Sequence, residues 1–445
     1  MHKSLIRVLL PLMLLSAGTA PSHAQTADGW TLRQCIDYAL QNNIQVKTKE
    51  VTLQNAEATL EQARAQQLPT LSFSSSFGAN FRNVTTFNDY LEESGRTSLS
   101  NNFGLNSGLA VYQGGRLRNT VLQNQIQRDA SQQDVEQARI DLEISVAQAF
   151  LQILYDHEAL DLNRQAAALS EQQVKRGEQL FQAGSISRVE LAQLKSQLAS
   201  DQYQIVAAEN TLENSRLKLK QLLELGLDEP FEIRYPAIDD AVIGEPVAEL
   251  ADIYAEALST LPQIRSSELG LESAELGVKI AKGAALPSLS MSAGISTGYS
   301  SGTGVTYFDQ LGNKLGESLG LNLSIPILSG KQVRTNVRKA QLQQESARLQ
   351  DQSTRKQLLS TLETARNDAI SAQQRYFASK AQLDAAAESF RLVTEQFDAG
   401  IKNIVELLTE KNKYLNALSQ QLQAKYQALL AEKLLQRYMN LPIEL

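Results

Sequence analysis

Two short motifs in this sequence contain residue types that could do chemistry. Gly294-Ile295-Ser296-Thr297-Gly298 has the spacing of a nucleophile elbow, which holds a catalytic serine on a tight strand-to-helix turn. The segment lies instead within a run of alternating polar and apolar residues, and no histidine follows it to act as a base. His157-Glu158 begins like a helical zinc-protease motif, but Asp161 stands where the second histidine ligand is needed. Neither motif is complete, so the sequence predicts no enzyme.

The composition excludes further classes of protein. Among 445 residues there are three His and one Cys, too few for a zinc cluster of several Cys and His ligands or for an internal disulfide framework. The net charge of −7 offers no basic surface for nucleic acid. No glycine-rich loop followed by Lys and Ser or Thr is present to bind nucleotide phosphates. We therefore expect no cofactor, no metal and no nucleic-acid partner.

Residues 1–24 have the three parts of a secretory signal peptide. Lys3 and Arg7 make the start positive, a short apolar stretch follows, and Ser22-His23-Ala24 offers a cleavage site with small residues. No later stretch approaches 18 apolar residues, so we expect an exported protein without a transmembrane helix. Cys35 we interpret as an unpaired, buried thiol on an early helix.

The rest of the chain is a duplicated unit. The segment LPTLSFSSSFG at Leu68 recurs as LPSLSMSAGIS at Leu286, and the turn Phe181-Gln182-Ala183-Gly184 recurs as Phe397-Asp398-Ala399-Gly400. Separated matches at a nearly constant spacing predict a repeat. We expect a single duct domain of residues 25–445, made of two repeats and an irregular connecting belt: 30–225, 247–439 and 226–246.

Four segments alternate between apolar and polar residues with a period of two. In the first, Leu71, Phe73 and Phe77 share one face and serines the other. The same alternation occurs in three later segments, at 102–111, 289–296 and 318–327. Period-two segments of about ten residues are the signature of membrane-barrel strands. The alternative is the edge of a soluble β-sandwich, which would need more strands.

Four strands cannot close a barrel in lipid, because membrane barrels start at about eight strands and open sheet edges are not tolerated there. The chain must therefore assemble from two, three or four copies. The connections at 82–98 and 299–317 differ in length between the repeats and are rich in Ser, Gly and Asn. We expect them to be the loops at the cell exterior.

The remaining chain is helical. No proline occurs between residues 116 and 230, so residues 116–182 would form a rod of about 100 Å at about 1.5 Å per residue. The returning segment of each repeat carries a heptad of apolar residues, which packs as a coiled coil: Leu191, Leu198, Ile205, Leu212 and Leu219, then Leu408, Leu415, Leu422 and Leu429. A cytoskeletal coiled coil would share this pattern but leave the strands and the signal peptide unexplained. The expected fold class is an α+β membrane protein, with four barrel strands and long coiled-coil helices per chain.

The order of these segments resembles the TolC family of outer-membrane efflux ducts over nearly the whole mature chain. The motifs that support this resemblance most specifically are Leu323-Ser324-Ile325-Pro326-Ile327-Leu328 with Gly330, the strand-to-helix turn Gly114-Gly115-Arg116, and the two Phe-x-Ala-Gly turns. The resemblance implies a homotrimer in which a twelve-strand β-barrel in the outer membrane lipid continues into a twelve-helix periplasmic tunnel. It also implies a passive exit duct of a Gram-negative-type cell, docked by a periplasmic adaptor protein and an inner-membrane pump.

Two other functions remain open at this point: a stand-alone outer-membrane diffusion porin and a structural spacer of the envelope. The long helices favour the duct, because a porin gains nothing from a rod of about 100 Å. The residues identify neither the transported substrate nor the energy source of the pump.

The two Phe-x-Ala-Gly turns are expected to be the hairpin tips farthest from the barrel, where the adaptor docks. Gly184 and Gly400 suit the left-handed position that ends a helix. The resemblance implies a closed-state constriction here, with an acid at Glu190, a base at Lys402 and a selectivity acid at Glu406. We expect Glu190–Lys402 pairs to hold the tips together and three Glu406 carboxylates to attract cations and raise one another's pKa. The alternative is that both glutamates merely solvate helix faces.

Overall fold

The computed structural model describes residues 29–82, 96–226, 228–236, 243–244 and 246–444. The predicted signal peptide, residues 1–24, lies outside the described residues, as does most of the predicted loop 82–98.

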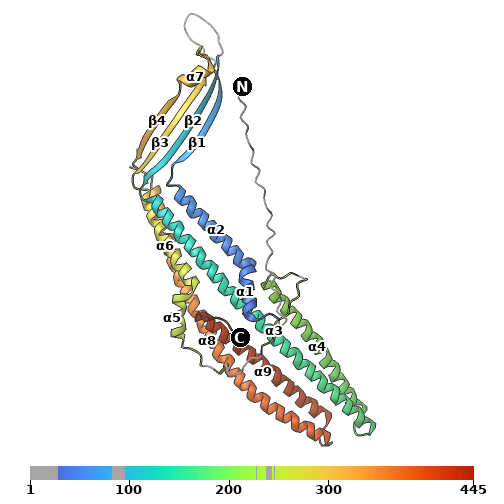
Figure 1. The fold of residues 1–445 in the computed structure, drawn as a ribbon. Coiled ribbons are helices and arrows are strands. Elements are labelled where there is room, and N and C mark those ends of the chain that lie inside the picture. Colours follow the sequence, from blue (N-terminus) through green and yellow to red (C-terminus); the bar gives the residue numbers. More distant parts are fainter. Residues whose placement is uncertain (1–28, 83–95, 227, 237–242, 245, 445) are drawn as a thin grey trace, which may run out of the picture.

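The elements follow one another twice in almost the same order (Figure 1). The first set is α1 (Leu32–Asn42), α2 (Ile44–Ala65), β1 (Thr70–Arg82), β2 (Arg96–Gln113), α3 (Arg116–Gln182) and α4 (Arg188–Leu222). The second set is α5 (Leu250–Thr260), α6 (Pro262–Gly283), β3 (Ser288–Ser300), α7 (Tyr307–Asn313), β4 (Gly316–Ser324), α8 (Gln332–Asp398) and α9 (Ile404–Tyr438).

Corresponding helices have equal lengths. α1 and α5 have 11 residues each, α2 and α6 have 22, α3 and α8 have 67, and α4 and α9 have 35. Only α7 has no counterpart in the described part of the first set. It falls within the predicted loop 299–317, so that prediction was wrong in part: the connection holds a helix as well as loop.

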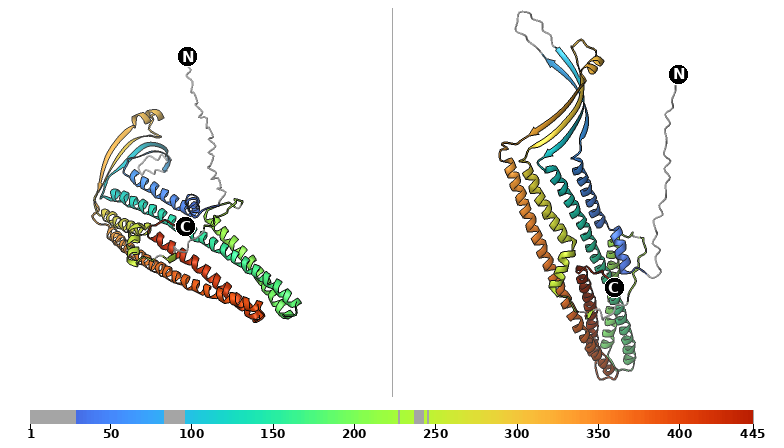
Figure 2. Two further views of the ribbon diagram at one scale, coloured as in Figure 1. Left: turned by 60° about the horizontal axis from the view of Figure 1, so that its bottom comes forward. Right: turned by 60° about the vertical axis from the view of Figure 1, so that its left-hand side comes forward.

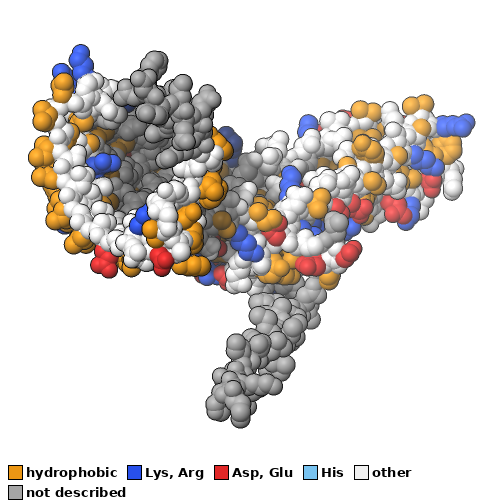
Figure 3. Space-filling view, turned by 90° about the horizontal axis from the view of Figure 1, so that it is seen from above, with side chains coloured by type: hydrophobic (Ala, Val, Ile, Leu, Met, Phe, Trp, Pro, Cys, Tyr) orange, Lys and Arg blue, Asp and Glu red, His pale blue; other side chains and the backbone are white. Residues whose placement is uncertain are grey.

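The four predicted strands form one antiparallel sheet in the order β1-β2-β3-β4. Apolar residues lie opposite one another across it, with Phe73 opposite Leu105 and Leu105 opposite Ile295, because antiparallel partners point to the same face. Seen from above, hydrophobic side chains line the convex outer margin of this sheet (Figure 3). β1 and β4 are its two edges.

The last strand is shorter than the alternation predicted. β4 ends at Ser324, because Pro326 has no N–H for a sheet hydrogen bond. Ile325 and Ile327, which we assigned to this strand, lie beyond its end, and Ile327 is 95% exposed.

Below the sheet, α8, α6, α3 and α2 lie side by side (right-hand view of Figure 2). α3 is the predicted rod, with the bounds expected for it, and extends from the sheet to the hairpin turn at the opposite end of the molecule. It packs against α2 and α6 in its first half and against α4 in its second half, and α8 packs likewise against α6 and α9. The long helices therefore connect the sheet rigidly to the two distant turns.

The largest core cluster lies midway along the molecule, where α1 and the connecting belt pack on α3. Cys35 is fully buried in it and unpaired, as expected, and burial raises the pKa of its thiol to about 12. The described part of the belt contributes a parallel bridge, in which Trp30 N–H donates to Glu232 O at 2.9 Å and Arg234 N–H donates to Trp30 O at 2.8 Å. The irregular character predicted for 226–246 is thus seen in its described part.

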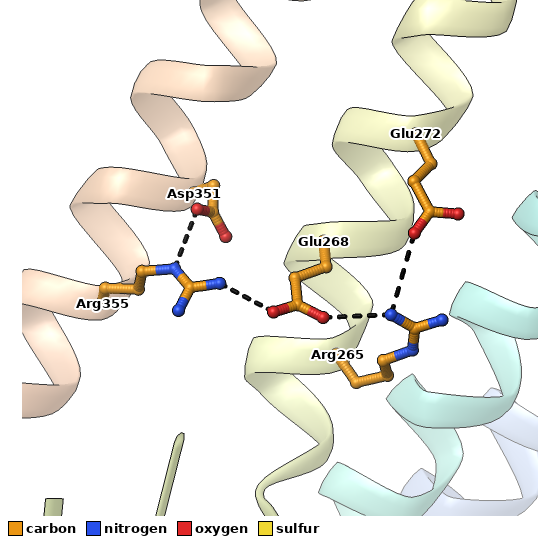
Figure 4. Close-up of polar contacts among 5 residues, drawn as sticks. All are labelled: Arg265, Glu268, Glu272, Asp351 and Arg355. Carbon is orange, nitrogen blue, oxygen red and sulfur yellow. Dashed lines mark hydrogen bonds and ion pairs between the residues drawn. The ribbon is translucent and has the colours of Figure 1, made fainter. Parts of the chain in front are cut away.

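A chain of ion pairs joins α6 to α8 (Figure 4). The Arg355 guanidinium lies 2.9 Å from Asp351 on its own helix and 2.8 Å from Glu268 on α6, and Glu268 also contacts Arg265 at 3.0 Å. Arg265 lies 3.8 Å from Glu272. The hydrogen bonds that Arg355 donates to Asp351 and Glu268 raise its pKa further, so this cation bridges the two helices.

Within the described residues, no helix is both long enough and apolar enough to cross a membrane.

Candidate functional site: the hairpin tips and the polar cluster above them

Both long helices end in the same backbone turn. Gly184 follows α3 with φ of 76°, and Gly400 follows α8 with φ of 72°. In each turn the glycine N–H donates to a phenylalanine carbonyl three residues earlier, Phe181 or Phe397, at 2.9 Å. The next N–H donates to the carbonyl five residues before it, at 2.8 and 2.9 Å respectively. This is the Schellman pattern, which needs a left-handed residue, and it reverses the chain at the two tips.

The helices that leave the turns begin with capping boxes. The Ser187 hydroxyl accepts from the Glu190 N–H at 3.3 Å, and the Glu190 carboxylate accepts from the Ser187 N–H at 2.7 Å. Asn403 and Glu406 make the equivalent bonds at the start of α9, at 3.0 and 3.2 Å. The two acids predicted as gate residues thus also cap helices. The Ser/Asn-x-x-Glu spacing is the sequence signal for this role.

The predicted Glu190–Lys402 pair does not form within the described chain. Lys402 Nζ instead contacts Glu406 Oε1 at 2.5 Å, because Lys402 lies in the turn just before the Asn403 cap and Glu406 lies four residues later in the first turn of α9. The hydrogen bond from Lys402, followed by that from the Asn403 N–H, lowers the pKa of Glu406. Within one chain this is opposite to the direction we expected from crowding of three carboxylates.

Apolar side chains from both hairpins share one cluster behind the turns. Arg176 on α3 also lies 3.8 Å from Asp398, the last residue of α8. The tips are therefore held as one unit by a small core and a surface ion pair. The buried members of the cluster are Val174, Leu194, Phe397, Ile404 and Leu407.

Farther from the tips, a buried polar cluster joins three helices. Lys411 on α9 has no exposed surface, and its ammonium contacts Asp201 on α4 at 2.7 Å, the Ala166 carbonyl on α3 at 3.4 Å and the Ser170 hydroxyl. Asp201 also accepts from Ser170 at 2.5 Å and from Gln197 at 2.8 Å. The hydrogen-bond partners named here for the buried Lys411–Asp201 pair thus come from the same two hairpins, α3–α4 and α8–α9, as the pair itself.

This cluster has a sequence signal that the motif search missed. Lys411 stands three residues after Leu408 and four before Leu415, which is a core position of that heptad. Asp201 stands three residues after Leu198, the equivalent core position of the first repeat. A charged residue at such a position predicts a buried partner, but the heptad alone does not say which one.

The strand-to-helix turns lie at the opposite end of the long helices. Gly114 and Gly115 have φ of 61° and 76°, and a Cβ on Gly114 would lie 2.3 Å from the Gly283 carbonyl oxygen. Arg116 then begins α3. In the second repeat Pro326 follows β4, Gly330 has φ of 55°, and α8 begins after Lys331.

Neither of the two sequence motifs for catalysis lies in the structural setting that its chemistry needs. Ser296 lies within β3 opposite Gly104, not on a strand-to-helix turn. The His157 ring stacks on Tyr235 at 3.9 Å and lies 3.9 Å from Asp161 on the same helix. In the part of the chain that the structure describes, no three His, Cys, Asp or Glu side chains are grouped to hold a metal.

The fold and its turns match known proteins over almost the whole chain. The family described as outer membrane efflux protein matches residues 35–224 and 253–441. The chain belongs to the outer membrane efflux protein family. The pyoverdine export outer membrane protein OpmQ of Pseudomonas putida is 24% identical to it, over 88% of this chain and 81% of that protein. The outer membrane protein TolC of Escherichia coli is 24% identical, over 96% and 85%. A crystal structure of CusC superposes with a TM-score of 0.80 at 18% identity, over 97% and 99% of the two chains.

Membership of the outer membrane efflux protein family confirms the resemblance to the TolC family and identifies the role of the protein. It is an outer-membrane exit duct for efflux, with its helical part in the periplasm. The family is one of ducts rather than enzymes, and it favours the duct over the diffusion porin and the envelope spacer.

Proposed function

We propose that three copies of this chain close a twelve-strand β-barrel in the outer membrane, continued by a twelve-helix tunnel, and that this trimer is the passive exit duct of a tripartite system. The observation that carries the proposal is the open sheet. Among the described residues, β1 and β4 are the unpaired edges of the sheet and run antiparallel to each other, so β4 of one copy can pair with β1 of the next in the same pattern.

Exposed apolar side chains on the helices support the same assembly. They occur on α2, α4 and α8, away from the core clusters, and a soluble monomer rarely exposes so many large apolar residues. Contact between neighbouring copies would cover them. Examples are Ile44, Val51, Tyr203, Val206, Leu342, Leu349 and Phe377.

We further propose that residues 25–445 form one duct domain of two repeats, 30–225 and 247–439, joined by the belt 226–246. The equal lengths of corresponding helices support this division. An energy-supplying inner-membrane pump and a periplasmic adaptor would act on the end of the duct opposite the sheet, at the turns of Gly184 and Gly400.

At this end we propose that Glu190, Lys402 and Glu406 line the constriction. Glu406 is 41% exposed on its side chain and Lys402 37%, so both are accessible to a passing ion. Planar-bilayer recording tests this role: Glu406→Gln should weaken cation preference, and Lys402→Glu should raise conductance. Glu388→Gln, an exposed acid on α8, is the control. Unchanged selectivity and conductance would contradict the gate.

The assembly itself is tested by native mass measurement of the detergent-purified protein. A trimer with β-sheet and helical spectra is expected. A stable folded monomer would overturn the proposed barrel, because its sheet edges would then be free.

Docking is tested with Gly184→Trp and Gly400→Trp, which should leave the trimer intact and abolish efflux in cells, since a Trp at a left-handed position disturbs the turns. Normal efflux in both variants would contradict docking at the tips.

A further inference from the structure

The apolar face of the sheet becomes polar near the end farthest from the helices. Leu105 on β2 lies opposite Ile295 on β3, but the next partners on this face are Phe103 with Thr297 and then Asn101 with Tyr299. Asn101 and Thr297 thus place an amide and a hydroxyl on the face that carries the hydrophobic margin of Figure 3. Exposed to lipid, such groups would lack hydrogen-bond partners.

α7 covers these polar groups from the same face. The Asn101 amide donates to the Tyr307 hydroxyl at 3.2 Å, and the Thr297 hydroxyl donates to the Leu311 carbonyl at 2.5 Å. The Tyr299 and Tyr307 rings lie 5.0 Å apart. Side chains of one sheet face make all three contacts, so α7 lies on the outer, apolar side of the sheet.

The buried side chain of Gln310 also holds α7 in this position. Gln310 is only 3% exposed. Its amide nitrogen lies 3.1 Å from the Ser300 carbonyl and 2.8 Å from the Thr303 hydroxyl, and its oxygen accepts from the Ser300 N–H at 3.0 Å. The amide therefore ties the helix to the last residue of β3.

Exposed apolar side chains lie on α7 and beside it, together with the exposed polar residues Asp309 and Asn313. Phe308 is 82% exposed, and Leu315 and Val305, which flank the helix, are 59% and 46% exposed. The ring of Phe308 packs edge-on against Tyr307 at 5.5 Å, so it is presented outward from a fixed base. α7 thus places exposed apolar side chains over the part of the sheet face where Asn101 and Thr297 are polar.

We propose that α7 is a lipid anchor, in which Phe308 enters the boundary between headgroups and acyl chains of the outer leaflet. The partner is lipid rather than protein, because the α7 surface continues the apolar face of the sheet and combines exposed aromatic and aliphatic side chains with a polar underside. Aromatic residues and short amphipathic helices favour this boundary of a bilayer. The inference rests on the proposed placement of the sheet in the outer membrane.

Tryptophan fluorescence with brominated lipid tests the anchor. Three variants of the full chain, Phe308→Trp, Phe73→Trp and Asn313→Trp, are reconstituted in phosphatidylcholine vesicles with and without bromine on the acyl chains. The native Trp30 lies in the helical part and gives the same background in each. Phe308→Trp should emit at shorter wavelength than Asn313→Trp, which is exposed at the far end of α7, and should lose emission in brominated vesicles.

Phe73→Trp, on the apolar face of β1, separates the two proposals. If it is not quenched, the sheet is not in lipid and the proposed barrel fails. If it is quenched while Phe308→Trp emits like Asn313→Trp, the barrel stands and the anchor is overturned. Gln310→Ala added to Phe308→Trp should weaken its quenching, because α7 then loses its hydrogen bonds to Ser300 and Thr303. Unchanged quenching there would contradict the role of Gln310 in holding α7.

Discussion

At the scale of single residues, the buried ammonium of Lys411 has a clear energetic consequence. Removing an ion from water costs several kcal/mol, and Asp201 with its surrounding hydrogen bonds offsets this cost only while the pair is complete. Because Lys411 comes from one hairpin and Asp201 and Ser170 come from the other, the cluster fixes how the two hairpins align.

Lys411→Met should therefore destabilise the helical part strongly, by about 3–5 kcal/mol, since it leaves the Asp201 carboxylate buried without a cation. Thermal unfolding of the purified protein measures this. Lys413→Met is the matched control, because Lys413 is 64% exposed and pairs with Glu410 on its own helix. The double variant Lys411→Met with Asp201→Leu should recover much of the loss. Equal melting of the single variant and the control would contradict the role of the buried pair.

The strand-to-helix turns offer a second test at this scale. Gly115 and Lys331 precede α3 and α8, and both have left-handed φ, 76° and 67°. Only glycine adopts this conformation without strain, which costs other residues about 1–2 kcal/mol. Lys331→Gly should stabilise the protein by about 1 kcal/mol and Gly115→Ala should destabilise it by a similar amount. A Cβ on Gly115 would meet nothing closer than 3.8 Å, so contacts do not confound the comparison. Changes in melting of the same sign in both variants would contradict this reasoning.

At the scale of elements, the first turns of α4 and α9 depend on their capping boxes. The orphan N–H groups at a helix start are satisfied here by Ser187 and Asn403, and the glutamates complete the exchange. Replacement of either cap by Ala should cost about 1 kcal/mol and speed hydrogen exchange at the start of that helix. In each single variant the start of the other helix is left intact and is the internal control. Unchanged protection from hydrogen exchange at the altered cap would contradict the capping role.

The α9 turn should also respond to acid. The folded-state pKa of Glu406 is lowered from its ordinary value of 4.5 by Lys402 and by the Asn403 N–H. The contribution of the Glu406 carboxylate to the stability of the α9 start is therefore complete above that ordinary pKa and is lost as the pH falls through the lowered pKa. Hydrogen exchange of the first α9 turn, corrected for the intrinsic rate, should rise as the pH falls below 4.5. Lys402→Met should move this rise to higher pH, whereas Lys413→Met should not. The same profile in both variants would show that Lys402 does not set the response.

At the scale of the whole molecule, the long helices place two kinds of surface at opposite ends. The sheet with its α7 anchor lies at one end, and the turns of Gly184 and Gly400 lie at the other (Figure 1). Since α3 spans the distance without interruption, the orientation of one end in the envelope determines that of the other.

An epitope tag inserted after Gly302 should therefore bind antibody on intact cells, because this glycine lies in the open turn between β3 and α7. A tag inserted after Gly184 should bind only after the outer membrane is permeabilised. Both glycines have open space around them, so insertion at either disturbs packing little. The reverse pattern of labelling would contradict the proposed topology.

The sequence by itself was sufficient for the features that depend on local pattern. The period of two predicted the strands and their apolar face, and the long stretch without proline predicted α3 from Arg116 to Gln182. The Phe-x-Ala-Gly repeats predicted both left-handed turns, because a glycine after a helix is a local requirement.

Only the tertiary structure decided which charged and polar groups meet. Lys411 meets Asp201 from the other hairpin, and α7 folds back on Asn101 and Thr297. These contacts join residues whose distance in space depends on how whole helices and strands pack. A periodic pattern specifies which face of an element is buried, but it does not specify the neighbour that buries it.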